Sequence, residues 1–244
     1  DQPRSRGLGD VYKRQLPDGI SASYAYTFEK VDASHTLEAR FIALEEVIEP
    51  MPAGALFDDV APEDWFYNAV GFVSGRSLFQ GTGERMFSPD AAMTRAMLVT
   101  VLWRMEGEPA AQDAAGTFGD LTQDWYTPAV RWASSAGIVD GTGQVVTESG
   151  AYAAFSPDAE ITREQLAAIL YRYAAYKRFV CETGSLDAFS DAAQASAYAR
   201  EPLAWAVGTG ILQGRSDATL DPRGDASRCE VAAMLMRFME AYGL

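Results

Sequence analysis

The chain has 244 residues, of which 48% are hydrophobic and 22% charged, so it carries enough apolar side chains to build a folded core. Its formal net charge of −14 disfavours nucleic acid as a partner, and no apolar run approaches the roughly 20 residues of a membrane span. The single histidine, His35, and two cysteines, Cys181 and Cys229, do not have the spacing of a zinc site. We therefore expect free thiols, no cofactor and no membrane insertion.

The N-terminal quarter of the chain has no helical pattern. Residues 1–15 end in a stretch, 7–15, that reads like a translated sequencing adapter, so we expect this segment to be non-native. Residues 16–46 contain two runs, 24–28 and 37–42, typical of strands, which predict the end of a β-rich surface module. Residues 47–56 are rich in proline and glycine and predict a linker.

From residue 57 onward three repeats follow one another, at 57–116, 117–187 and 188–244. Each has a Phe-x-Asp start, an aromatic residue, a glycine 16 residues after the aromatic, a proline loop, and an arginine six residues after the proline. The second repeat has eight additional residues, around 144–153, which we expect to lie in a loop. In repeat order the aromatics, glycines and arginines are Trp65, Trp125 and Tyr198; Gly81, Gly141 and Gly214; and Arg95, Arg163 and Arg228.

Each repeat predicts two helices. The first follows the aromatic residue and ends at Gly137 and Gly210 in the later repeats. The second is predicted at 94–106, 162–175 and 227–241, where Thr94, Thr162 and Ser227 are N-caps and Gln165 and Glu230 complete capping boxes. Its apolar stripes contain Leu102, Leu170 and Leu235. We therefore expect a mainly α fold with a pseudo-threefold arrangement around a three-helix core, preceded by a short β remnant.

The three arginines lie in the first turn of these second helices. A cation there opposes the helix dipole at a cost of about 0.3–1 kcal/mol, so its occurrence at three identical positions indicates a use other than stability. A helix N-terminus and a guanidinium together suit a carboxylate or phosphate. The alternative is a structural salt bridge to Asp59, Asp120 or Asp191. On the binding interpretation, Arg163→Ala leaves the fold intact.

Trp65, Trp125 and Tyr198 could stack on a sugar ring beside the anion, or could be core aromatics. Trp132 and Trp205, in the first helices, are expected in the core. Because tyrosine offers a smaller stacking face than tryptophan, we expect Arg228→Ala to harm binding less than the equivalent change at Arg95 or Arg163. The arginine and aromatic of one groove could, however, come from neighbouring repeats.

The order of these landmarks over residues 57–244 resembles the S-layer homology family. This resemblance implies grooves between adjacent repeats that bind secondary wall polymers, often pyruvylated, in bacterial envelopes. The Thr-Arg-Ala-Glu motif of the family corresponds to residues 94–97, 162–165 and 227–230, none of which matches it fully. The implied ligand-binding set consists of the arginines and aromatics, the caps Thr94, Thr162 and Ser227, and the glycines Gly81, Gly141 and Gly214.

The resulting expectation is a non-catalytic, extracellular module of the cell wall or S-layer. It anchors an exported protein by binding an anionic secondary cell wall polymer, with no nucleic acid partner. Two alternatives are a structural, self-assembling surface-layer protein and the anchor of an extracellular hydrolase whose catalytic domain is not in this sequence.

Overall fold

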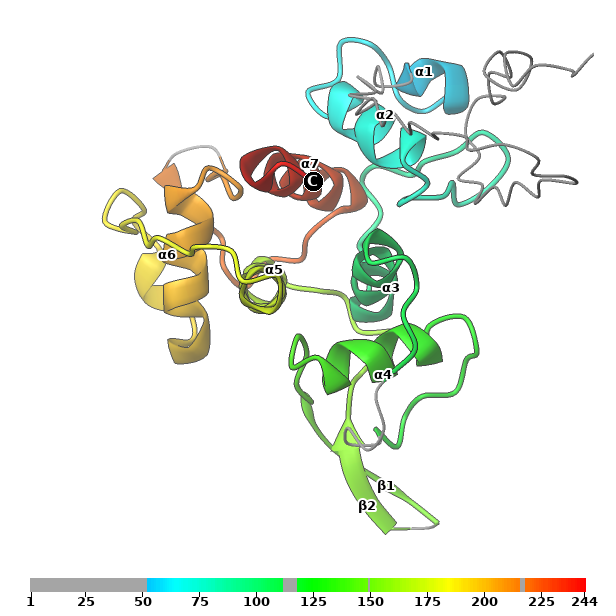
Figure 1. Cartoon of the computed structure of the whole chain (residues 1–244). Coiled ribbons are helices and arrows are strands. Elements are labelled where there is room, and N and C mark those ends of the chain that lie inside the picture. Colours follow the sequence, from blue (N-terminus) through cyan, green and yellow to red (C-terminus); the bar gives the residue numbers. More distant parts are fainter. Residues whose placement is uncertain (1–51, 112–117, 149, 216–217) are drawn as a thin grey trace, which may run out of the picture. The chain divides into compact units, whose positions relative to one another are not determined.

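The computed structural model describes residues 52–111, 118–148, 150–215 and 218–244, all of which belong to one compact unit (Figure 1). The expected non-native segment and the expected β remnant lie outside the described residues. The described chain is mainly helical, as predicted. None of its helices is both long and apolar enough to span a membrane.

The first helix of each repeat begins shortly after the aromatic residue. The predicted ends are confirmed, because Gly137 and Gly210 have φ values of 71° and 75°, a conformation that glycine adopts without strain. Ser77 takes this place in the first repeat, with φ of 58°. These helices are α2 (Tyr67–Gly75), α4 (Thr127–Ser135) and α6 (Arg200–Gly208), and α6 is preceded by the 3-10 helices η2 (Ala192–Gln194) and η3 (Ala197–Ala199).

The second helix of each repeat begins at the arginine, as the capping pattern predicts. Thr94, Thr162 and Ser227 each accept a hydrogen bond from the backbone N–H three residues later. Both predicted capping boxes are present, with Gln165 and Glu230. The helices are α3 (Arg95–Met105), α5 (Arg163–Tyr176) and α7 (Arg228–Tyr242).

The insertion in the second repeat, which the sequence predicted to lie in a loop, forms an antiparallel hairpin. Strand β1 (Gly143–Thr147) pairs with β2 (Gly150–Ala154), with Gly143 opposite Ala154. The backbone N–H of Gly119 donates to the carbonyl of Ala153 at 2.9 Å. The base of the hairpin is therefore fastened to the start of its repeat.

The end of the expected linker also has regular structure. Residues 53–56 form the short helix α1 (Ala53–Leu56), which packs against α2. Ala53 is fully buried in the core. The compact unit therefore begins before the Phe-x-Asp motif of the first repeat.

Backbone hydrogen bonds join the three repeats in a closed ring, just before their second helices. The N–H of Met93 donates to the carbonyl of Ala226 at 3.1 Å, and the N–H of Ala226 donates to Ile161 at 2.8 Å. The N–H of Ile161 then donates to Met93 at 2.8 Å and closes the ring. All three residues are buried, so these donors and acceptors are satisfied only by each other's repeats.

The helices pack across the repeat boundaries. α3 lies beside α4, α5 beside α6, and α7 beside α2, so each second helix packs closely against the first helix of the following repeat (Figure 1). The sequence predicted that the second helices meet along their apolar stripes around one axis, and it did not predict this packing against the first helices.

Leu102, Leu170 and Leu235 nevertheless lie in one continuous core and are fully buried. Side chains of the three second helices meet at Tyr173, whose ring is 5.6 Å from that of Phe238 and whose hydroxyl donates to Glu106 at 2.6 Å. Trp132, Trp205 and Cys229 are also in the core, and both cysteines are free, as expected.

Candidate functional site: three grooves between the repeats

The Phe-x-Asp aspartates hold the proline loops in place. Asp59 accepts hydrogen bonds from the backbone N–H groups of Phe87 at 2.8 Å and Ser88 at 2.7 Å. Asp120 and Asp191 bond the equivalent loop residues in the same way. Within the described residues none of the three forms an ion pair with Arg95, Arg163 or Arg228. They are turn-forming residues, and the salt bridge considered from the sequence is absent from this part of the chain.

The three helix-opening arginines are buried at the boundaries between repeats. Arg95 is 5% exposed, and its Nε donates to the carbonyl of Phe155 at 2.9 Å while its Nη2 donates to that of Asp140 at 3.3 Å. Both acceptors belong to the following repeat. Burial lowers the pKa of this guanidinium, and nearby Asp120 and Asp140 oppose that effect.

Arg163 and Arg228 make the same contacts with the repeats that follow them. Their Nε atoms donate to the carbonyls of Leu220 at 2.9 Å and Phe87 at 2.8 Å. Their Nη2 atoms donate to Gln213 at 2.7 Å and Gln80 at 2.8 Å. The arginines therefore fasten each repeat to the next, and these contacts argue against the expectation that Arg163→Ala leaves the fold intact.

Each arginine also lines a groove. The first groove has a volume of about 350 Å³ and is lined by residues of all three repeats. Arg228 comes from the third repeat, Gly81 and Arg104 from the first, and Trp125 from the second. The two arginines and the aromatic face one cavity although they are distant in the sequence.

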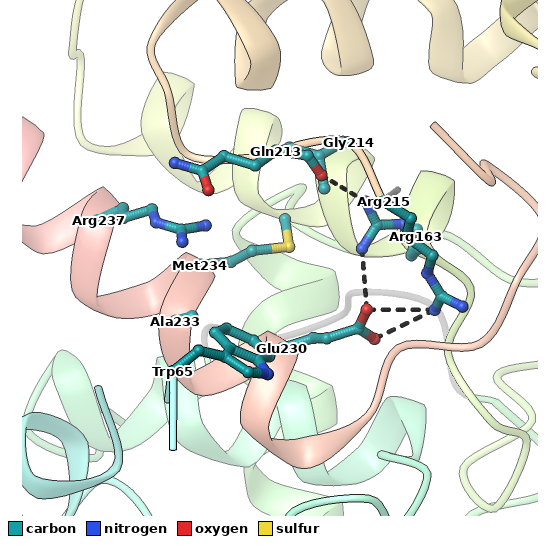
Figure 2. Close-up of a pocket in the computed structure, with 10 residues that line it drawn as sticks. Trp65, Arg163, Gln213, Gly214, Arg215, Glu230, Ala233, Met234 and Arg237 are labelled. Atoms are coloured by element: carbon teal, nitrogen blue, oxygen red, sulfur yellow. Dashed lines mark hydrogen bonds and ion pairs between the residues drawn. The ribbon is translucent and has the colours of Figure 1, made fainter. Parts of the chain in front are cut away.

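The other two grooves have the same composition, shifted by one repeat each time. The second groove, of about 380 Å³, is lined by Arg95, Gly141, Arg172 and Tyr198 among others. The third groove, of about 240 Å³, is lined by Arg163, Gly214, Arg237 and Trp65 among others (Figure 2). In every groove the buried arginine comes from one repeat, the glycine loop and second helix from the next, and the aromatic from the remaining repeat.

This composite arrangement changes the expected ranking of the grooves. Tyr198 lies in the groove of Arg95, not in that of Arg228. Arg228 shares its groove with Trp125. The sequence-based reason for expecting the weakest effect from Arg228→Ala therefore does not apply.

The three aromatics are groove residues and not core residues. Trp65, Trp125 and Tyr198 are 63%, 49% and 52% exposed. The ring of Trp125 meets that of the buried Tyr126 edge to face at 4.9 Å, and about half of Trp125 remains exposed. Such a ring suits stacking on a sugar.

The glycines and caps serve the loops and helices beside the grooves. A Cβ atom at Gly81 would lie 2.8 Å from the carbonyl oxygen of Met86, and one at Gly214 would lie 2.9 Å from that of Thr219. A larger residue therefore does not fit these loops. Thr94, Thr162 and Ser227 cap their helices and are not among the residues that line the three grooves.

A second arginine, not predicted from the sequence, lines every groove. Arg104, Arg172 and Arg237 each stand nine residues after the first arginine of their repeat and line the grooves with it. Their identical spacing was a usable signal. It was missed because these positions lie beside the apolar stripe, where a charged residue is typical of a solvent-exposed helix face.

Tyr198 is held in place by a contact that, among the described residues, has no equivalent in the other two grooves. The buried carboxylate of Glu164 accepts hydrogen bonds from the Tyr198 hydroxyl at 3.3 Å and the Ser196 hydroxyl at 2.7 Å. Burial raises the pKa of Tyr198, and the charge of Glu164 raises it further. The described residues contain no group of acidic, histidine or cysteine side chains arranged to hold a metal ion.

Comparison with known proteins is consistent with this three-repeat arrangement. A model of the S-layer homology domain matches residues 56–96, 117–167 and 188–232. The chain is 28% identical over 189 residues to an amylopullulanase of Thermoanaerobacterium thermosulfurigenes, covering 77% of this chain and 10% of that protein. It is 26% identical over 218 residues to the S-layer protein sap of Bacillus anthracis, covering 89% and 25%.

A further relative is the exoglucanase XynX of Acetivibrio thermocellus, which is 27% identical over 198 residues, covering 78% of this chain and 17% of that protein. The chain thus spans a quarter or less of the length of these relatives. The similarity concerns a module that recurs in proteins with different names.

Proposed function

Because the chain belongs to the S-layer homology family, we propose that it anchors an exported protein non-covalently to the bacterial cell wall, by binding an anionic secondary wall polymer in its inter-repeat grooves. Domains of this family are binding modules that attach to secondary cell wall polymers. The protein is extracellular and associated with the cell wall or S-layer. The proposal includes two finer points. The polymer carries an acidic group, such as a pyruvyl carboxylate, and the grooves are where it binds.

The observation that carries the proposal is the recurrence of two arginines and one aromatic ring in each groove. Guanidinium groups form charge-assisted hydrogen bonds with carboxylates and phosphates, and their planar donor set favours these anions over neutral groups. An exposed aromatic ring beside them can stack on a sugar. Together they suit an acidic polysaccharide, despite the net negative charge of the whole chain.

The proposal includes a pseudo-threefold arrangement of the repeats, with boundaries at 57–116, 117–187 and 188–244. The hydrogen-bond ring of Met93, Ile161 and Ala226 supports it, as does the cyclic order of helix packing. Such an arrangement generates three similar grooves from one repeated sequence.

The names of the relatives suggest two kinds of protein that the module could serve. An S-layer protein points to a lattice-forming chain, and an amylopullulanase or exoglucanase points to an anchored hydrolase. In both cases the proposed task of the described residues is attachment and not catalysis.

The test is retention of the chain by purified Gram-positive wall sacculi, before and after chemical removal of their acidic polymers. We expect binding only to untreated sacculi, and weaker binding as salt screens the charges. The variant Arg104→Gln/Arg172→Gln/Arg237→Gln should lose binding. Arg131→Gln/Arg200→Gln/Arg223→Gln is the matched control, because it removes the same charge from exposed positions that do not line the grooves. Equal binding by both triple variants, or by stripped sacculi, contradicts the proposal.

A further inference from the structure

The three grooves differ in how their arginines are neutralised. We propose that the first groove, lined by Arg228, Arg104 and Trp125, is the one that binds the acidic group of the wall polymer, while acidic side chains of the chain itself weaken the other two. This inference rests on the proposed function. It concerns which groove is used and which residues make the difference.

In the first groove neither guanidinium forms an ion pair within the described residues. Arg228 donates to two backbone carbonyls, and its Nη1 has no hydrogen-bond partner in that part of the chain. The carboxylate that acts on it is Asp59, whose two oxygens already accept backbone N–H groups. Within the part of the chain that the structure describes, Arg104 donates only to the carbonyl of Leu78, at 3.3 Å. The charges of both arginines therefore remain available to an anion.

In the second groove a carboxylate of the chain already occupies one arginine. Oδ2 of Asp140 lies 2.7 Å from Nη2 of Arg172, and the charge of Asp140 also acts on Arg95. The buried Glu164 adds a second negative charge next to Tyr198. An incoming carboxylate meets like charges here, and must displace Asp140 to reach Arg172.

In the third groove the carboxylate of Glu230 lies between two guanidinium groups. It is 3.3 Å from Nη1 of Arg163 and 3.2 Å from Nη2 of Arg215, as the dashed lines in Figure 2 show. Arg215 is also paired with Asp221 at 3.1 Å. Glu230 thus occupies the position that a ligand anion needs.

Two equivalent positions account for much of this difference. The residue before the loop glycine is Gln80 in the first groove, Asp140 in the second and Gln213 in the third. The third residue of the second helix is Met97, Gln165 and Glu230 in the same order. Only the first groove has an uncharged side chain at both positions. The acid that acts on Arg228, Asp59, has equivalents in Asp120 and Asp191, so it does not distinguish the grooves. A like charge facing a ligand anion weakens its binding by about tenfold or more, so these two positions are enough to rank the grooves.

The test transfers acids between equivalent positions and measures binding to the soluble acidic polymer extracted from wall sacculi, by titration calorimetry. Met97→Glu and Gln80→Asp should each weaken binding by roughly tenfold or more. Gln165→Glu and Gln213→Asp introduce the same side chains at the same positions of the other grooves, and should change affinity less than about twofold. Glutamate at position 97 is compatible with the helix, because Thr94 can form the capping box that Ser227 forms with Glu230.

The complementary change is Asp140→Asn, which frees Arg172 and should add a second binding site to the titration. Similar losses for all four acidic variants, with unchanged thermal unfolding, overturn the preference for the first groove and leave the proposed function standing. Failure of the unaltered chain to bind the polymer overturns both.

Discussion

At the scale of single residues, the buried arginines hold neighbouring repeats together and also line the grooves. Arg163 is 3% exposed, and its Nε and Nη2 satisfy two backbone carbonyls of the third repeat. Nη1 faces Glu230 in the third groove. A buried cation needs such partners, and the carbonyls would lack donors without it. Repeat docking and the charge of the groove therefore depend on the same side chain.

Arg163→Ala should therefore lower the free energy of unfolding by about 1–3 kcal/mol, because it leaves the carbonyls of Leu220 and Gln213 without donors. Leu170→Ala should cost about 2–5 kcal/mol through a core cavity. Urea denaturation followed by circular dichroism measures both. Arg163→Lys is the control that separates charge from hydrogen bonding, because lysine keeps the positive charge but cannot bond both carbonyls. Wild-type stability of Arg163→Ala contradicts the structural role.

The tyrosines at the end of α5 predict a loss of stability at alkaline pH. The hydrogen bond to Glu201 raises the pKa of Tyr171 from 10.0 to about 12, and burial, followed by the bond to Glu106, raises that of Tyr173. A raised pKa means that the folded state holds its proton more tightly than the unfolded state. The stabilisation is therefore complete below pH 10, and for Tyr171 it is lost as pH rises through about 12.

We expect the free energy of unfolding to fall between pH 10 and 12, and to fall less steeply in Tyr171→Phe/Tyr173→Phe. Denaturation curves across this range give the slope, and phenolate absorbance reports the two titrations. Tyr152→Phe, on the hairpin, is the control for loss of a phenol elsewhere. An identical slope in the double variant contradicts the assignment.

At the scale of elements, the hairpin β1–β2 is an addition to a loop that the other repeats form without it. The backbone N–H of Thr142 donates to Ala154, and that of Thr82 donates to Met86 in the first repeat, both at 2.8 Å. The bond from Gly119 to Ala153 likewise has an equivalent between Asp58 and Arg85. The base of the loop is therefore the same with and without the insertion.

Deletion of residues 144–151 should accordingly leave the fold intact. In the shorter loops Arg85 and Ala218 have φ values of 54° and 55°, so Ala153→Gly should accompany the deletion to permit this conformation. We expect a thermal midpoint within a few degrees of the full chain, measured by calorimetry. The same deletion without Ala153→Gly should be less stable. Loss of cooperative unfolding in the deletion variant that carries Ala153→Gly would show that the hairpin is part of the core structure.

At the scale of the whole unit, stability depends on closure of the ring of repeats. α7 of the third repeat packs on α2 of the first, and Ala226 supplies both a donor and an acceptor to the ring. Without the third repeat, α2 and α5 lose the helices that cover them. The repeats are thus unlike an open stack, in which each unit contacts only its neighbours in the sequence.

A chain of residues 52–187 should therefore fail to unfold cooperatively, because its apolar helix faces are exposed. Addition of a separate chain of residues 188–244 should restore helical signal and a cooperative transition, which circular dichroism can follow. A stable, cooperatively unfolding chain of the first two repeats alone contradicts the closure argument.

The sequence by itself determined the repeats and their helices. Thr162, Gln165 and Gly137 act through contacts within a few residues, so their types and spacing were enough to place caps and helix ends. The apolar stripe with Leu170 identified a buried face for the same reason. The spacing also identified Arg163 as unusual, although not what surrounds it.

Only the tertiary structure decided how the grooves are assembled. Arg95, Asp140 and Tyr198 come from three repeats and meet because the ring closes, which no local pattern encodes. From sequence alone, a cation in the first turn of a helix is expected to be destabilising. Only the folded structure shows that carbonyls of the next repeat accept its hydrogen bonds. Local interactions follow from sequence spacing, whereas the partners of buried charges depend on segments that are brought together only by folding.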